Sequence, residues 1–439
     1  IKWNMASFMG RVNYGYMGRY LLTLSARYDG SSRLAEGHKW VLFPSAALAW
    51  RISDEPFMKD LVWLDNLKLR VGYGKTGNSA VSPYQTKGQL ALRHYVFNNG
   101  SSEYIGYAPS VMANDQLTWE TTDQWNVGVD FGFLKNRING TVEFYLQNTK
   151  DLLLKRQLPV VSGFSSVMSN VGSTRNKGIE ITLNTRNIMN RNFTWSTDLT
   201  FSANKEEIVE LYNGKTDDVG NLWFIGQPID VYYNYKKIGI WQNTENDLAE
   251  MAKFNEKGAN FKPGSIRLED VDGDYKITEE DKQILGSVRP KFVASMVNNF
   301  EFKGFDLSVF LYASVGGLLR NNIEFMEKPG RGNTVKVDYW TSTNPTNAFP
   351  RPSVDVEKLD YISTLGYDKA DFLRIRNITL GYTLPEMWSK KVLMDKIRIY
   401  LSANNPAIFT NFTGIDPEGA NGRTAPSYST WMFGINLSM

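Results

Sequence analysis

The sequence predicts an all-β protein, specifically an antiparallel β-barrel that spans a membrane. Two patterns carry this prediction. Apolar and polar residues alternate along about thirteen segments, most of them near ten residues long. Short and long connections also alternate between these segments. A tilted strand of about ten residues crosses a bilayer, and outer-membrane barrels have short turns on one side and long loops on the other.

The final segment, residues 431–439, shows the alternation most clearly. Its odd positions are apolar, and small or polar residues stand at most of the positions between them. Successive side chains of a strand point to opposite faces, so one face of this segment is apolar. We interpret it as the closing strand of the barrel. The apolar positions are Trp431, Phe433, Ile435, Leu437 and Met439.

The other strands precede this segment in order. They are predicted at residues 4–16, 19–29, 43–52, 66–76, 124–133, 137–148, 177–185, 193–202, 291–302, 305–315, 372–383 and 396–403. Residues 77–123 are polar, aromatic and interrupted by glycine, and we place no strand there. The alternation lapses over 204–290, a large extracellular insertion, and over 316–369, a second long extracellular loop. The whole chain, 1–439, is therefore interpreted as one portion of a single barrel.

The composition is consistent with this class. The net charge of +3 gives no indication of nucleic acid as a partner, and the lack of cysteine excludes disulfide and thiol chemistry. No apolar run is long enough for a membrane helix. A soluble sandwich or propeller is the alternative, but its outward faces should be polar. Here one face of nearly every strand is aromatic or aliphatic and the other carries Arg, Asp, Asn and Thr, which favours lipid outside and water inside.

The sharpest local motif is an acidic loop at residues 270–281. Its oxygen-bearing groups follow the spacing of an EF-hand calcium loop, and a hard divalent cation takes six to eight such oxygens. The expected ligands are Asp270, Asp272, Asp274, the Lys276 carbonyl, Thr278 and Asp281. Two departures are Tyr275 in place of the usual glycine and an aspartate in place of the final glutamate. An acidic surface turn is the alternative, and we expect a bound Ca²⁺ to staple an outer loop.

The sequence shows no catalytic constellation. Residues 72–77 approach a phosphate-binding loop, but Leu69 stands where that pattern needs a glycine. His38 and His94 are the only histidines, and neither has a metal-ligating neighbour. No Gly-x-Ser-x-Gly motif occurs. We therefore expect that the protein is not an enzyme.

Aromatic residues crowd the large insertion. Such side chains in a barrel mouth can stack on sugar rings or on peptide side chains, so four are candidate substrate-binding residues. The alternative is that they form the core of the insertion or an interface girdle. The candidates are Trp223, Tyr232, Tyr233 and Trp241.

Short motifs run in order through nearly the whole chain. They lie at residues 27–33, 43–45, 49–52, 67–78, 117–120, 290–292, 303–307, 372–382 and 416–418. Together they resemble the SusC/RagA family of TonB-dependent outer-membrane transporters. The family usually ends in phenylalanine, whereas Met439 keeps only the apolar character of that position.

The resemblance implies a barrel of about 22 strands with an N-terminal plug. It also implies a SusD-like surface lipoprotein as a lid, a dimer of such pairs, and TonB as the source of energy. We therefore expect active import of an oligosaccharide or oligopeptide across the outer membrane of a Gram-negative bacterium. A passive porin-type channel is the alternative.

The number of predicted strands is odd, whereas bacterial single-chain barrels are generally even-numbered. The strands at 4–16 and 431–439 would each leave unpaired backbone groups in lipid, at several kcal/mol per group. We therefore expect another polypeptide, or an earlier part of the same one, to carry about nine strands and the plug. Ile1 is expected in an outer loop.

Overall fold

The computed structural model describes every residue except 1, 101, 322–336, 353–359 and 420–426. Thirteen long strands follow one another in chain order in one sheet, which confirms the predicted class. Each of the thirteen predicted segments coincides with one of these strands, within a few residues at most ends. They are β1 (Met5–Tyr16), β2 (Tyr20–Ser31), β3 (Trp40–Arg51), β4 (Leu64–Asn78), β7 (Glu120–Phe133), β8 (Ile138–Lys150), β11 (Ser173–Met189), β12 (Phe193–Glu210), β17 (Phe292–Phe302), β18 (Phe305–Val315), β21 (Phe372–Thr383), β22 (Lys396–Thr410) and β23 (Thr430–Ser438).

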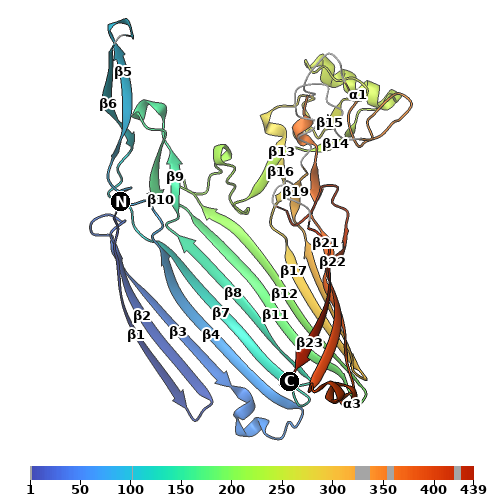
Figure 1. Ribbon diagram of the computed structural model, residues 1–439. Coiled ribbons are helices and arrows are strands. Elements are labelled where there is room, and N and C mark those ends of the chain that lie inside the picture. Colours follow the sequence, from blue (N-terminus) through green and yellow to red (C-terminus); the bar gives the residue numbers. More distant parts are fainter. Residues whose placement is uncertain (1, 101, 322–336, 353–359, 420–426) are drawn as a thin grey trace. The chain divides into compact units, whose positions relative to one another are not determined.

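The residues fall into two compact units, 1–229 with 296–303 and 230–295 with 304–439. In the first unit, β1 to β4, β7, β8, β11 and β12 pair in antiparallel succession (Figure 1). The strand registers align one apolar side chain from each strand into a row across the sheet. That row is Tyr14, Leu22, Leu48, Val71, Val127, Phe144, Ile179 and Ala203.

The opposite face of the same strands is polar. Arg70 forms ion pairs with Asp130 at 2.9 Å and with Glu143 at 3.2 Å. The hydroxyls of Ser25 and Ser45 are hydrogen-bonded at 2.6 Å across β2 and β3. The two faces therefore differ in chemistry as the alternation predicts, because side chains one residue apart point to opposite sides of a strand.

In the second unit, β18, β21, β22 and β23 pair in the same antiparallel way. One row of apolar side chains crosses them: Leu307, Leu380, Leu401 and Phe433. The five apolar side chains predicted at 431–439 are all exposed. On the other face Arg398 and Asp306 form an ion pair at 2.5 Å. A Cβ at Gly381 would lie 2.4 Å from the Arg398 guanidinium, so a glycine leaves room for this ion pair.

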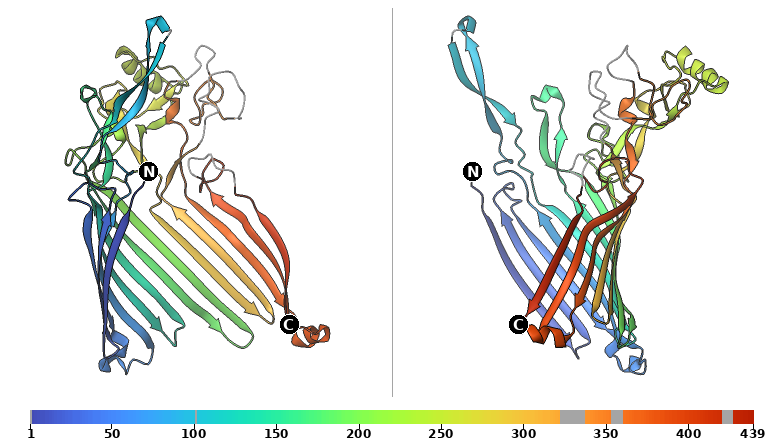
Figure 2. Two further views of the ribbon diagram at one scale, coloured as in Figure 1. Left: turned by 60° about the vertical axis from the view of Figure 1, so that its left-hand side comes forward. Right: turned by 45° about the vertical axis from the view of Figure 1, so that its right-hand side comes forward.

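Several connections at one end of the strands are tight turns, whereas those from β3 to β4 and from β21 to β22 contain short helical turns. Leu134, Lys135 and Asn136 all have positive φ values, between 55° and 60°, and join β7 to β8. At the other end of the first unit, two connections form hairpins, β5 (Gln89–Phe97) with β6 (Ser102–Val111) and β9 (Leu153–Gln157) with β10 (Ser166–Asn170) (Figures 1 and 2). No strand was predicted in either hairpin. Apolar and polar residues share both faces of β5 and β6, so no clear period marks them.

Residues 230–290 of the large insertion fold as a small subdomain of the second unit, whereas residues 204–229 belong to the first unit. In this subdomain, β13 (Val231–Tyr235) pairs with β16 (Lys282–Ser287) and β14 (Lys237–Ile240) pairs with β15 (Ile266–Leu268). Helix α1 (Glu245–Glu256) was not predicted, although Thr244 is a good N-cap whose side chain accepts the Asp247 N–H. Its Met251 and Phe254 pack against Trp241 in a buried cluster. β12 continues to Glu210, past residue 204 where the alternation lapses.

The predicted loop 316–369 contains a short ribbon, β19 (Leu318–Arg320) paired with β20 (Tyr367–Lys369). Residues 322–336 and 353–359 of that loop lie outside the described residues. A four-residue helix, α3 (Glu386–Ser389), connects β21 to β22. Within the described part of the chain, no helix combines the length and apolar character needed to cross a membrane.

The strand order begins at β1 and ends at β23. In the part of the chain that is described, β1 pairs with β2 on one edge and β23 pairs with β22 on one edge. No pairing is found on the second edge of either strand in that part.

If lipid covers the apolar face, replacement of Ile181 by arginine should destabilise the protein by about 2–4 kcal/mol, because a charge near the bilayer midplane loses its hydration. Ile181 lies mid-way along β11 between Val142 and Phe201. Unfolding of the full-length protein from lipid vesicles measures the change. The control is Thr182→Arg, which places the same charge on the polar face. Equal losses from both variants would contradict lipid on the Ile181 side.

Candidate functional site

The acidic loop 270–281 joins β15 to β16 in the second unit. Carboxylate oxygens of Asp270, Asp272 and Asp274 lie within 4.8 Å of one another. Asp270 accepts the N–H groups of Gly273 and Tyr275 at 2.9 Å each, so its side chain sets the curvature of the loop. A concentration of three carboxylates in so small a volume suits a hard divalent cation with oxygen ligands.

The last predicted ligand, Asp281, is almost fully buried and closes the loop. Its two carboxylate oxygens accept the N–H of Val271 at 2.8 Å and the N–H of Thr278 at 2.7 Å. Each oxygen keeps a second lone pair for another partner. The side chain therefore ties the two ends of the loop together and can still contribute to a cation.

Tyr275 occupies the position where such loops usually have glycine, and it adopts a left-handed conformation with φ 63°. This costs a non-glycine residue about 1–2 kcal/mol. Packing offsets the cost, because the Tyr275 ring lies edge-on to Phe254 at 5.4 Å within the Trp241 cluster. The substitution for glycine is thus compatible with the loop geometry and anchors the loop to α1.

The electrostatics of the loop favour a counter-charge. A hydrogen bond from the Asp274 N–H lowers the pKa of the Asp272 carboxyl, but desolvation and the negative charges of Asp274 and Asp281 outweigh it. The pKa of Asp272 is therefore raised. Repulsion between neighbouring carboxylates is relieved when a cation binds between them.

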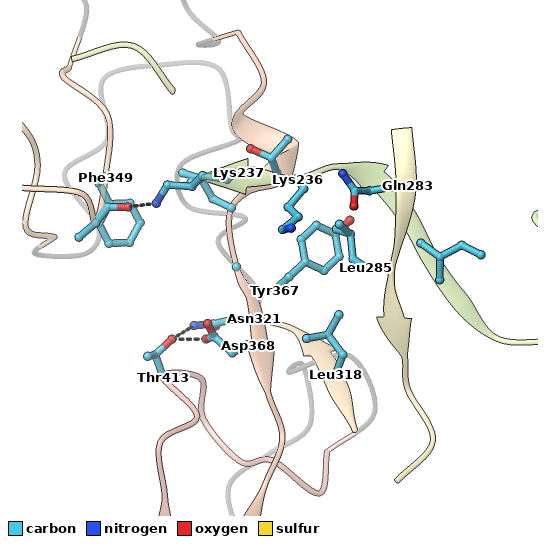
Figure 3. Close-up of a pocket in the computed structure, with 15 residues that line it drawn as sticks. Lys236, Lys237, Gln283, Leu285, Leu318, Asn321, Phe349, Tyr367, Asp368 and Thr413 are labelled. Atoms are coloured by element: carbon cyan, nitrogen blue, oxygen red, sulfur yellow. Dashed lines mark hydrogen bonds between the residues drawn. The ribbon is translucent and has the colours of Figure 1, made fainter. Parts of the chain in front are cut away.

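A pocket of about 600 Å³ lies beside this loop, also in the second unit (Figure 3). Strands β16, β19 and β20 all contribute residues to its lining. The lining residues are Lys236, Lys237, Gln283, Ile284, Leu285, Leu318, Asn321, Ala348, Phe349, Thr364, Leu365, Gly366, Tyr367, Asp368 and Thr413.

Glu269 links the pocket to the acidic loop. It directly precedes Asp270, pairs with the Lys236 ammonium at 3.0 Å and accepts a hydrogen bond from the Gln283 amide at 2.7 Å. Lys236 and Gln283 both line the pocket. Glu269, next to the acidic loop, therefore holds two residues of the pocket lining in place.

The polar groups of the pocket are held in place. The Lys237 ammonium donates to the carbonyl oxygens of Asn347 and Ala348 at 2.7 Å each, and burial lowers its pKa although the Asp368 charge opposes the shift. At the other end, Thr413 accepts from Asn321 at 2.7 Å and donates to the Asp368 carboxylate (Figure 3). The pocket thus offers fixed groups of both charge signs between aliphatic and aromatic walls.

The four predicted aromatic residues lie in different surroundings. Trp241 is 1% exposed and packs inside the helical subdomain, so its ring cannot stack on a ligand and its assignment to substrate is corrected. Tyr232 lies edge-on to the pocket residue Tyr367 at 5.2 Å, whereas Tyr233 points to the other side of β13. Trp223 belongs to the first unit. The pocket itself was not predicted.

Two of the sequence motifs meet in this unit. Arg374, 3% exposed, pairs with Asp416 at 2.7 Å and with Glu418 at 3.0 Å, and Arg376 also pairs with Glu418. Burial alone would raise the pKa of Asp416, but hydrogen bonds from Ser427, from the Glu418 N–H and from Arg374 lower it to about 2. Ion pairs therefore connect the motif at 372–382 to the motif at 416–418.

The family model described as "TonB dependent receptor-like, beta-barrel" matches residues 3–406. The chain belongs to this family of TonB-dependent receptors. Family membership places it in the outer membrane and identifies the apolar face of its strands as the lipid-facing surface. Members of this family are receptors and transporters, which agrees with the expectation that the chain is not an enzyme.

Curated TonB-dependent receptors align with almost all of the chain. TonB-dependent receptor P3 of Formosa agariphila is 33% identical over 99% of this chain and 45% of its own length. TonB-dependent receptor SusC of Bacteroides thetaiotaomicron is 32% identical over 99% of this chain and 43% of its own length. The chain therefore spans a little under half the length of these relatives. The resemblance to SusC-type receptors is confirmed.

Among solved structures, the RagAB peptide transporter superposes on 99% of this chain with a TM-score of 0.81 and 26% identity. The chain covers 48% of that structure's chain. The RagAB peptide importer in an "open-open" state superposes equally well, with a TM-score of 0.81. The TonB-dependent receptor fold described above is therefore that of a SusC/RagA-type barrel.

The Asp416 carboxylate, held by hydrogen bonds from Ser427, the Glu418 N–H and Arg374, should stabilise this receptor at neutral pH. A carboxyl whose pKa falls from 3.8 to about 2 on folding contributes about 2 kcal/mol above pH 4, and this is lost as the pH falls towards 2. Asp416→Asn should remove that contribution and the steep acid dependence with it. Thermal unfolding of the full-length protein in detergent between pH 7 and 2 measures both. Asp60→Asn, at an exposed site, is the control, and a parallel acid profile for wild type and Asp416→Asn would refute the assignment.

Proposed function

We propose that this chain is part of an active importer that moves an oligosaccharide or an oligopeptide across the outer membrane with energy from TonB. The match of residues 3–406 to the TonB-dependent receptor barrel carries the proposal. The similarity to SusC and to RagAB supports an oligomeric nutrient as cargo. In this proposal the plug, the remaining strands and the TonB-contacting segment belong to polypeptide outside these 439 residues.

A SusD-like surface lipoprotein is the proposed partner, and pairs of transporter and lipoprotein are proposed to dimerise. The support is the likeness to SusC and RagAB, whose families are paired systems. The acidic loop belongs to the large insertion, and the pocket lies where this insertion meets residues of the second long loop and Thr413. Both are at the end of the second unit opposite to α3 (Figure 1). This end carries the long connections, where a surface lipoprotein would cover the cargo.

The pocket is the proposed cargo subsite, and its chemistry favours a peptide. In the described residues β13 is the one strand that pairs with β16, and Gln283, Ile284 and Leu285 of β16 line the pocket. An extended peptide can add to the edge of a strand through backbone hydrogen bonds. Sugar rings prefer open aromatic faces, but the Tyr367 ring already contacts Tyr232 and the Arg320 guanidinium.

Uptake by cells that carry the full-length transporter and its partner tests the cargo and the energy source. We expect a casein-derived peptide pool to enter and a maltooligosaccharide pool to be excluded. Uptake should stop when a protonophore collapses the proton gradient. Uptake of the maltooligosaccharide pool alone would show that the cargo is a glycan and not a peptide. Uptake that persists with the protonophore would indicate a passive channel.

Filling the pocket should block cargo without disturbing the barrel. Leu318 lines the cavity from β19, so Leu318→Trp should reduce peptide binding at least about tenfold, equivalent to a loss of 1.4 kcal/mol. Leu248→Trp makes the same change on exposed α1 and should bind as the wild type does. Titration calorimetry on the purified full-length complex provides the comparison. If Leu318→Trp and Leu248→Trp bind the peptide with the same affinity, the pocket is not a cargo-binding site.

We further propose that the loop 270–281 binds one Ca²⁺ through Asp270, Asp272, Asp274, Lys276, Thr278 and Asp281. The three converging carboxylates and the raised pKa of Asp272 support it. A bound Ca²⁺ would supply no chemistry beyond cross-linking the loop. It would thereby hold the start of β16, whose next residues form a pocket wall.

Calcium titration of the full-length protein should give a dissociation constant on the order of 10⁻⁴–10⁻³ M. Asp272→Asn should weaken it about tenfold, since affinity follows the number of ligand charges. Glu280→Gln neutralises an exposed neighbour at a position that is not a predicted ligand, and it should leave the affinity unchanged. If both variants titrate alike, or if no binding occurs up to about 10 mM, calcium is not the ligand of this loop.

A further inference from the structure

The connection between β21 and β22 is a rigid, structured segment. α3 continues into a 3₁₀ turn (Lys390–Val392), and the Asp395 N–H donates to the Ser438 carbonyl at 2.8 Å. The buried Ser389 hydroxyl donates to the carbonyls of Glu386 and Asp395. The segment is therefore fixed beside the end of β23, as all views show (Figures 1 and 2).

This segment carries a cluster of uncovered apolar side chains, which we call the α3 cluster. Its members are Met387, Trp388, Val392 and Leu393. Leu393 is 89% exposed, and it also has a left-handed backbone with φ 59°. Glycine or asparagine normally takes that position after a helix, because a larger side chain costs about 1–2 kcal/mol there. No packing within the described protein offsets the cost at Leu393.

The α3 cluster is continuous with the lipid-facing surface of the sheet. β22 begins at Lys396, three residues after Leu393, and its Ile397 stands opposite Leu437 of β23 in the apolar face. Trp388 adds the amphipathic ring that is enriched where membrane and water meet. The basic residues Lys391 and Lys396 flank the cluster and are exposed. Such side chains attract the phosphates of anionic lipids.

We propose that the segment 385–395 is an interfacial membrane anchor, in which the α3 cluster inserts at the boundary between acyl chains and headgroups. Lys391 meets an anionic phospholipid headgroup at the same boundary. Lipid contact supplies the burial that offsets the strained backbone of Leu393. The anchor fixes the C-terminal strand at a constant depth in the bilayer.

Fluorescence of the full-length protein in phosphatidylglycerol-containing vesicles tests this insertion. The sequence of this chain has no cysteine, so a label sensitive to polarity can be placed by Leu393→Cys or by Val161→Cys. Val161 is 97% exposed in the β9–β10 connection, at the end of its unit that carries the long connections. We expect a blue-shifted emission and quenching by nitroxide lipids at position 393, and quenching by aqueous iodide alone at position 161.

Equal iodide quenching at both positions would overturn the proposal. Protection of position 393 from both iodide and nitroxide lipid would also overturn it, because a protein partner would then cover the cluster. The variant Leu393→Asn distinguishes a membrane anchor from a strained turn that has no contact with lipid. Asparagine relieves the strain but cannot enter the membrane, so an anchor predicts a lower thermal unfolding midpoint in vesicles. A strained turn without lipid contact predicts a higher one.

Discussion

The structure depends on one constraint, which is that backbone N–H and C=O groups inside a bilayer must find partners within the protein. Water is absent there, and each unpaired group costs several kcal/mol. Neighbouring long strands meet this requirement by antiparallel pairing, for example over thirteen consecutive pairs of residues between β7 and β8. With the backbone pairing in place, the side chains are left to match two different solvents. The rows of apolar residues on one face and of ionic and hydroxyl groups on the other follow from that division.

The polar face is organised by charge and by the size of the residues between the charges. Arg70 contacts Asp130 on the neighbouring strand and Glu143 on the strand beyond it. Arg398 reaches Asp306 across β21 in the same manner, and Gly381 lies beneath that contact. These pairs lie in a partly aqueous environment, so each contributes little to stability by itself. Their effect is to fix the direction of long side chains that would otherwise extend freely into the water.

Much of the sheet could be predicted because a strand between lipid and water has an unambiguous period of two. Residues 124–133 show the pattern without interruption and residues 431–438 show it with Met432 as the exception, and both lie in strands. The β5–β6 hairpin has no such solvent boundary, and helix α1 needed recognition of Thr244 as a cap. The oxygen spacing of the acidic loop is visible in sequence because its carboxylates lie within twelve consecutive residues, 270–281.

The pocket and the Arg374–Asp416 pair could not be predicted in the same way. The two partners of that pair are 42 residues apart, and the pocket combines residues from 236 to 413. Only the folded arrangement of β16, β19 and β20 brings these residues together. Trp241 illustrates the same limit, since a tryptophan at a barrel mouth and a tryptophan in a subdomain core have the same sequence signature.

The acidic loop has one further consequence for how a cation would act. Asp281 and Asp270 already hold four backbone N–H groups, and Tyr275 is already packed against Phe254. The loop is thus preorganised, and a bound ion would not have to order it. Binding would then yield little conformational signal, in contrast to a sensor whose helices rearrange. A cation at this site would raise the free energy of unfolding of the insertion and leave its folded conformation unchanged.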